Sequence, residues 1–131
     1  MTYPTKPCKL LILEDDPNLA SVLKDYLESF AYEVVCVQNG ADGVRAIMDE
    51  QFDVIFCDII MPTMSGDLFY SAVERMNPGL CERFIFVTGA RDNKRIKEFL
   101  TRINAAVLPK PFLMEDLLEM IGFVQLKRAL L

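Results

Sequence analysis

Residues 52–58 read Phe-Asp-Val-Ile-Phe-Cys-Asp, a short and mostly apolar run that ends in a carboxylate. A run that is apolar on both faces is typical of a central strand in a parallel sheet. An earlier run, residues 9–13, is followed in the same way by Glu14 and Asp15. Because the carboxyl ends of neighbouring parallel strands lie at one edge of the sheet, we expect Glu14, Asp15 and Asp58 to converge there.

Carboxylates that converge in this way repel one another. Two of them about 4 Å apart, at an effective dielectric constant near 20, cost roughly 4 kcal/mol. A cluster of this kind therefore indicates a bound cation or a chemical role. Taken one at a time the acids also have a structural explanation, because acids that follow a strand are common helix caps.

Strand-like and helix-like segments alternate along the chain. Short apolar or β-branched runs are followed by apolar residues at helical spacing, and Gly, Pro and Asn separate the segments. The expected strands are 9–13, 33–37, 52–57, 83–87 and 105–108. The expected helices begin at Pro17, before Val44, and at 66, 92 and 114, with a turn at 77–79. This (βα)5 order predicts an α/β fold, a doubly wound parallel sheet with helices on both faces.

Size and charge restrict the function classes. With 131 residues the chain can form one good core, which we expect over residues 8–131 after a tail of residues 1–7. The net charge of −5 argues against a general attraction to nucleic acid or to an anionic membrane. No apolar run reaches the length of about 20 residues that a bilayer span needs, and the first residues lack the apolar segment of a signal peptide, so a cytoplasmic location is expected.

The four cysteines indicate neither a zinc site nor a disulfide framework. They are Cys8, Cys36, Cys57 and Cys81, which are widely spaced and form no Cys-x-x-Cys pair, and the chain has no histidine. We expect them to be reduced and mostly buried. The absence of histidine also removes the commonest general base and excludes a phosphohistidine within this chain.

Four sequence pieces together resemble a response-regulator receiver domain. They are Leu-Ile-Leu-Glu-Asp-Asp-Pro at 11–17, Asp-Ile-Ile-Met-Pro-Thr-Met-Ser-Gly at 58–66, Val-Thr-Gly at 87–89 and Lys-Pro-Phe at 110–112. The resemblance extends from about residue 8 to residue 127. It implies the flavodoxin-like strand order 2-1-3-4-5.

The resemblance implies a role for each acid. Asp58 would be the nucleophile that takes a phosphoryl group from a phosphohistidine donor. Glu14, Asp15 and Asp58 would bind Mg²⁺, with the backbone carbonyl of Ile60 as a further ligand, and oxygen ligands are those that Mg²⁺ prefers. Asp16 matches no ligand of the family pattern, and we expect it to cap the helix that begins at Pro17.

Two further site residues follow from the same resemblance. Thr88 would donate its hydroxyl to a phosphoryl oxygen, beside Gly89, which leaves room for the donor. Lys110 would pair with phosphoryl oxygens as a flexible point charge, and its bond to Pro111 is expected to be cis. Taken singly, Thr88-Gly89 could be a turn and Lys110 a solvated charge. The functional interpretation is favoured because a single fold brings five side chains together, namely Glu14, Asp15, Asp58, Thr88 and Lys110.

The implied function is that of a signalling switch that catalyses its own phosphorylation. Its partners would be a sensor histidine kinase or a histidine phosphotransfer domain, and a downstream output protein or domain; a homodimer through the last two helices is also known in the family. Val107 stands where many members carry an aromatic switch residue. Output is then expected through residues 91–101, or through onward phosphotransfer. Ile60 and Ala90 predict slow self-dephosphorylation, because neither can position water.

Other functions fit the same residues less well. An aspartyl phosphatase would need a general acid two residues after Asp58, where Ile60 stands. A nucleotide or flavin binder would need a phosphate loop after the first strand, where the chain reads Glu-Asp-Asp-Pro. The main alternative is a receiver-like interaction module that works without phosphorylation. The segment 104–112 looks more like receivers attached to hybrid kinases than like stand-alone regulators.

Overall fold

The structure is a computed structural model that describes residues 7–89 and 93–129. Within these residues five strands alternate with five α-helices, as the sequence predicts. The strands are β1 (Lys9–Leu13), β2 (Glu33–Val37), β3 (Val54–Asp58), β4 (Phe84–Thr88) and β5 (Ala106–Pro109). The helices are α1 (Pro17–Glu28), α2 (Gly40–Asp49), α3 (Gly66–Met76), α4 (Lys94–Ile103) and α5 (Met114–Ala129). None of the described helices combines the length and apolar character that a bilayer crossing requires.

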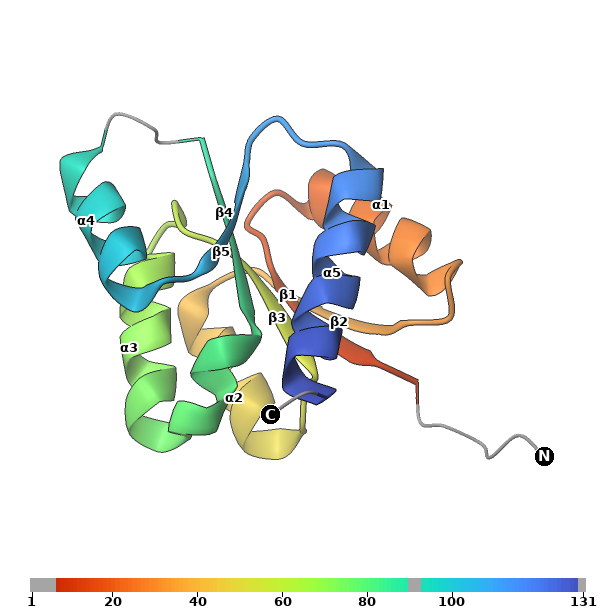
Figure 1. Cartoon of the computed structure of the whole chain (residues 1–131), viewed down its shortest axis with the longest axis horizontal. Helices are drawn as coiled ribbons and strands as arrows, with labels where there is room; N and C mark the ends of the chain where they lie inside the picture. Colours follow the sequence, from red (N-terminus) through yellow and green to blue (C-terminus); the bar gives the residue numbers. More distant parts are fainter. Residues whose placement is uncertain (1–6, 90–92, 130–131) are drawn as a thin grey trace.

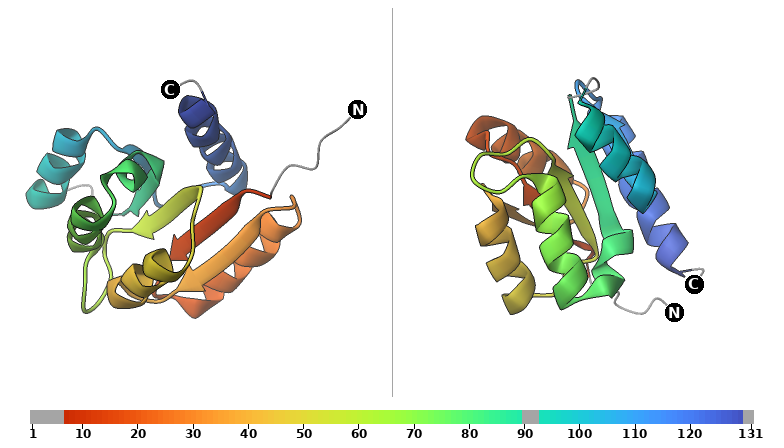
Figure 2. Two further views of the ribbon diagram at one scale, coloured as in Figure 1. Left: turned by 90° about the horizontal axis from the view of Figure 1, so that it is seen from below. Right: turned by 90° about the vertical axis from the view of Figure 1, so that its left-hand side faces the viewer.

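The strands form one parallel sheet in the order β2-β1-β3-β4-β5, which confirms the expected topology. Figures 1 and 2 show helices on both faces of this sheet. Helices α1 and α5 pack on one face, and α2, α3 and α4 pack on the other. Every residue of β3 and β4 is buried, whereas the edge strands β2 and β5 are partly exposed. The central position of β3 explains why its sequence is an uninterrupted apolar run.

Side-chain caps fix where several helices begin. The carboxylate of Asp16 accepts hydrogen bonds from the backbone N–H groups of Asn18 (3.0 Å) and Leu19 (3.4 Å), so the predicted cap of α1 is confirmed. Asn93 caps α4 in the same way, and this helix therefore begins at residue 94 and not at 92. The Lys110–Pro111 peptide bond is cis, as the resemblance implied.

The structure corrects two further expectations. Where a simple turn was predicted at 77–79, a 3-10 helix, η1 (Pro78–Arg83), forms and buries Leu80, so β4 begins one residue later than expected. None of the four cysteines forms a disulfide, but only Cys57 is buried, and the other three are partly exposed. The expectation that they are mostly buried was wrong for Cys8, Cys36 and Cys81, which pack against the margins of the two core clusters and stay partly exposed.

Candidate functional site

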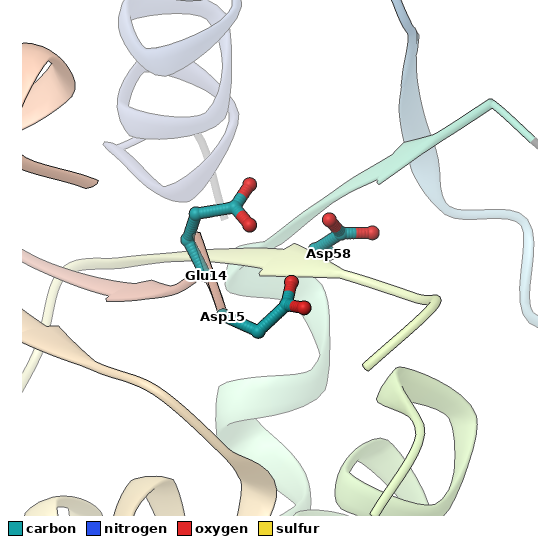
Figure 3. Close-up of side chains that lie close together, drawn as sticks. All are labelled: Glu14, Asp15 and Asp58. Carbon is teal, nitrogen blue, oxygen red and sulfur yellow. The ribbon is translucent and has the colours of Figure 1, made fainter. Parts of the chain in front are cut away.

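Three acids meet at the carboxyl edge of the sheet. Strand β1 pairs directly with β3, so Glu14 and Asp15, which follow β1, lie next to Asp58 at the end of β3. One carboxylate oxygen from each residue lies within 4.8 Å of those from the other two. Figure 3 shows the three side chains at the ends of these two strands. The predicted convergence of the acids is therefore confirmed.

Backbone N–H groups hold two of these carboxylates in place. Glu14 and Asp58 are almost completely buried, with exposed fractions of 1% and 4%, whereas Asp15 is exposed. Oε2 of Glu14 accepts a hydrogen bond from the backbone N–H of Asp16 at 3.1 Å. Oδ1 of Asp58 accepts one from the backbone N–H of Ile60, also at 3.1 Å. These bonds offset part of the cost of burying the carboxylates and fix their orientation.

Lys110 brings a positive charge to the two buried acids. Its Nζ atom donates hydrogen bonds to Oδ2 of Asp58 at 2.6 Å and to Oε1 of Glu14 at 3.3 Å. The backbone N–H of Lys110 donates to the carbonyl of Thr88 at 3.0 Å, which ties the start of the β5–α5 loop to the end of β4. The cation is thus held by its own backbone as well as by the acids that it neutralises.

The pKa values of Glu14 and Lys110 are both raised from their ordinary values. Burial is the main cause that raises the pKa of Glu14, and the nearby Asp15 and Asp58 raise it further, against the lowering effects of the Asp16 N–H and Lys110. For Lys110, burial lowers the pKa, but the hydrogen bond and charge of Asp58 and the charge of Glu14 outweigh it, and the net direction is upward. Lys110 therefore stays protonated, and the acids would favour additional positive charge.

The donor set fits Mg²⁺. Magnesium takes hard oxygen ligands at about 2.0–2.1 Å, and carboxylates are such ligands. The carboxylate oxygens of Glu14, Asp15 and Asp58 lie within 4.8 Å of one another, so these three residues would hold the ion. The exposed Asp15 leaves the group open to water, and Mg²⁺ usually keeps several waters.

A hollow of about 400 Å³ opens over the acids. Glu14, Asp15, Asp58 and Lys110 line it, together with four residues that surround them, namely Asp16, Leu19, Ile60 and Gly89. Ile60 is 51% exposed and presents an apolar side chain beside Asp58. Thr88 is buried at the end of β4, in register with Pro109 of β5, and does not line the hollow. Ala90 lies outside the described residues.

Some parts of the site were missed by the sequence analysis. The N–H groups of Asp16 and Ile60 orient the acids, but a backbone donor carries no signal in its residue type. Leu19, which lines one wall, reads in the sequence as an ordinary apolar helix position. In the sequence Gly66 is only the last residue of a motif, yet its backbone N–H donates to the carbonyl of Ile59 at 2.8 Å and brings α3 against the end of β3.

Comparison with known families agrees with this geometry. The sequence profile described as "Response regulator receiver domain" matches residues 10–122, which is most of the chain. The chain belongs to the response regulator receiver family. As a receiver it carries an acidic pocket, formed by Glu14, Asp15 and Asp58, that is typical of the family's phosphoacceptor site and of receivers that bind Mg²⁺. Members of the family take phosphoryl groups from histidine kinases.

Individual relatives support the same assignment. The receiver is 30% identical over 111 residues to the "Response regulator receiver protein CpdR" of Brucella abortus (strain 2308), a match that covers 85% of this chain and 91% of CpdR. It is 35% identical over 75 residues to the "Transcriptional regulatory protein GlrR" of Escherichia coli (strain K12), covering 57% of this chain but only 17% of GlrR. The matched part therefore corresponds to a small fraction of GlrR and to nearly all of CpdR.

A solved structure extends the comparison to the fold. The crystal structure of a CheY-like response regulator receiver domain protein from Methanospirillum hungatei JF-1 superposes with a TM-score of 0.86 at 28% sequence identity. The match covers 95% of this chain and 98% of that protein. The sheet and helices of the receiver are thus those of its family.

Proposed function

We propose that this receiver accepts a phosphoryl group on Asp58 from a phosphohistidine, carried by a sensor histidine kinase or a histidine phosphotransfer domain. The observation that carries the proposal is the environment of Asp58. Its carboxylate is buried beside two further acids, and Lys110 donates to it at 2.6 Å. A nucleophile, a cation to neutralise phosphoryl charge and a set of metal ligands are then present in one hollow.

In the proposed transfer an oxygen of Asp58 attacks the phosphorus atom. A new O–P bond forms, the P–N bond of the phosphohistidine breaks, and the imidazole nitrogen keeps the bonding electron pair and takes up a proton. The Ile60 N–H fixes the orientation of the attacking carboxylate through Oδ1. Lys110, which already donates to Oδ2, would move to the oxygens of the incoming phosphoryl group and neutralise their charge.

Glu14, Asp15 and Asp58 would hold Mg²⁺, with the backbone carbonyl of Ile60 as a further ligand. When bound, the ion supplies positive charge for the phosphoryl oxygens and makes the reaction Mg²⁺-dependent. The chain's own residues prepare this site, because the Asp16 N–H holds Glu14 beside Asp58. Thr88 would contribute its hydroxyl from the end of β4 to a phosphoryl oxygen.

We infer that the phosphorylated form is long-lived. The Ile60 side chain lines the hollow with apolar atoms and has no group that can orient an attacking water. The change Ile60→Asn introduces a polar group at this position, and faster loss of phosphate is expected. An equally fast hydrolysis in both proteins would contradict this part of the proposal.

Intact mass after incubation with acetyl phosphate and Mg²⁺ tests the proposed function. We expect the mass to rise by one phosphoryl group in the wild type, and not in Asp58→Asn. Asp16→Asn is the matched control, because it removes an acid from the same hollow but keeps a side chain that can cap α1. Uptake that persists in Asp58→Asn, or no uptake in the wild type, would favour an interaction module that works without phosphorylation.

The biological setting follows as part of the same proposal. Phosphorylation adds about 1.5 to 2 negative charges at the sheet edge, enough to bias a loop or helix with two arrangements. That bias would signal to an output protein or domain, or to a second copy of the chain. We place the folded unit at residues 8–131, after a tail of residues 1–7, and the reaction in the cytoplasm, where four cysteines without disulfide bonds are compatible with the reducing environment.

A further inference from the structure

An ion pair joins helix α3 to helix α4 away from the acidic hollow. Asp67, in the first turn of α3, is 9% exposed, and its Oδ2 accepts a hydrogen bond from the guanidinium of Arg95 in the first turn of α4. Its Oδ1 accepts a second bond from the hydroxyl of Ser65 at 2.5 Å. Both oxygens of a nearly buried carboxylate are therefore satisfied, one by its own loop and one by a neighbouring helix.

The charges at the start of α4 show why this contact matters. A helix N-terminus carries partial positive charge and is stabilised by acids, yet α4 begins with Lys94 and Arg95 and has no acid in its first turn. Helix α3, in contrast, has Asp67 in its own first turn. Asp67 therefore brings a negative charge to the first turn of α4. Figures 1 and 2 show α3 and α4 as neighbours on one face of the sheet.

Asp67 is also connected to the end of β3. The preceding residue, Gly66, donates its backbone N–H to the carbonyl of Ile59 at 2.8 Å, and it packs against the carbonyl of Asp58. A shift of the backbone at Asp58 would therefore be passed through Gly66 to Asp67. Interfaces of this kind carry energetic coupling when the linked element has two arrangements.

Strand β5 carries Val107 at the position where many receivers have an aromatic switch residue. Val107 is partly exposed and lines a groove between β5 and α5 with Met120 and Phe123. Helix α4 packs on the core through Ile96 and Phe99, with Leu100 and Ile103 partly buried beside them, and the ion pair of Arg95 joins it to α3. Within residues 7–89 and 93–129, the Asp67–Arg95 contact is thus a polar link between the segment after Asp58 and this helix.

We propose that the Asp67–Arg95 ion pair transmits the phosphorylation state of Asp58 to helix α4. The proposal rests on the phosphoacceptor function proposed above and names the route by which that site regulates the rest of the domain. Asp67 moves with the loop that follows Asp58. Because Arg95 is paired with Asp67, the stability of the first turn of α4 depends on the position of Asp67. Loss of either partner disconnects α4 from the site.

Hydrogen exchange of the α4 amides, followed by mass spectrometry, tests the resting half of the proposal. In unphosphorylated protein, the amides of peptides covering α4 are expected to exchange about fivefold faster in Arg95→Gln than in the wild type. The reason is that the partly exposed Asp67–Arg95 ion pair stabilises the first turn of α4. Lys97→Gln is the matched control on the same helix, since Lys97 is exposed and has no ion-pair partner among the residues that the structure describes. Arg95→Lys, which keeps the charge, should exchange at close to the wild-type rate.

The same measurement with acetyl phosphate and Mg²⁺ tests the coupling. We expect phosphorylation, verified by intact mass, to change α4 exchange in the wild type and in Lys97→Gln but not in Arg95→Gln or Asp67→Asn. Equal α4 responses in Arg95→Gln and the wild type, at equal phosphorylation, would overturn the proposal. So would unchanged exchange of resting Arg95→Gln. A wild type that takes up no phosphate would instead refute the phosphoacceptor function and, with it, the signal that the ion pair is proposed to carry.

Discussion

Gly66→Ala adds one methyl group at the point where α3 approaches the end of β3. A Cβ atom on Gly66 would lie 2.7 Å from Cα of Ile59, 2.8 Å from the carbonyl oxygen of Asp58 and 3.0 Å from Sγ of Cys57. The first two are backbone atoms and cannot rotate away. Either α3 must move away from the sheet, or the backbone of Asp58 and Ile59 must shift.

The expected magnitude follows from this geometry. Adding atoms to a well-packed interior typically costs about 1–3 kcal/mol, and contact with backbone atoms on β3 places Gly66→Ala in the upper part of that range. The better helix propensity of alanine returns at most about 1 kcal/mol. We therefore expect a net loss of about 2 kcal/mol in the free energy of unfolding, measured by urea titration. Phosphorylation by acetyl phosphate should also slow, because the clash displaces the residue that carries the nucleophile.

Gly122→Ala is the matched control. It makes the same chemical change inside α5, where a Cβ atom would meet nothing within 4 Å. A gain of about 0.5–1 kcal/mol is expected there, because glycine is unfavourable in a helix interior. If Gly66→Ala were as stable as the wild type and took up phosphate at the same rate, the close approach of α3 to Asp58 would not control the site.

Four further measurements test separate parts of the structure. Lys110→Ala should lower the rate of phosphate uptake at least about tenfold, measured by intact mass over time, whereas a wild-type rate would remove Lys110 from the mechanism. Saturating Mg²⁺, at about 100 times its Kd, should stabilise the wild type by about 2.7 kcal/mol, and Asp15→Asn should lose most of this gain in a thermal melt. Thr63 is a β-branched residue with a φ of 72°, so Thr63→Asn should raise the free energy of unfolding by about 1 kcal/mol. No gain in a urea titration would argue against backbone strain at this residue. Although burial alone would raise the pKa of Asp67, the Ser65 hydroxyl and Arg95 lower it below its ordinary value of 3.8. The wild type should therefore have a higher free energy of unfolding than Asp67→Asn above pH 3.8, and this difference should disappear as the pH falls through the lowered pKa. Urea titrations that give the same difference at every pH in this acid range would contradict a stabilising role for the Asp67 carboxylate.

Most of the fold could be predicted because its signals are local. Strand β3 is apolar at every position before Asp58. It lies between β1 and β4 in a sheet that helices cover on both faces, and a strand in that position requires apolar side chains on both of its own faces. The (βα)5 alternation then fixed the parallel sheet. The order of the strands, in contrast, came from the family resemblance, because no periodicity states which strand pairs with which.

The differences between prediction and structure arise where tertiary contacts decide. Residues 78–83 form η1 because Leu80 is buried in the core. The turn-like sequence at this point does not predict that burial. Cys81, the next residue after Leu80, is only partly buried, although it packs against the same core. Asn93 delays the start of α4 because its side chain, and not its position in the apolar pattern, satisfies the Ile96 N–H.

The chain alone determined the alternation of strands and helices and the placing of acids at strand ends, because hydrophobic period and side-chain charge are properties of neighbouring residues. The tertiary structure decided which charges meet. Lys110 lies 52 residues after Asp58 in the sequence, and Arg95 lies 28 residues after Asp67. Only the packing of strands and helices brings such distant groups within hydrogen-bond distance, and it also selects the backbone N–H groups that orient the buried carboxylates.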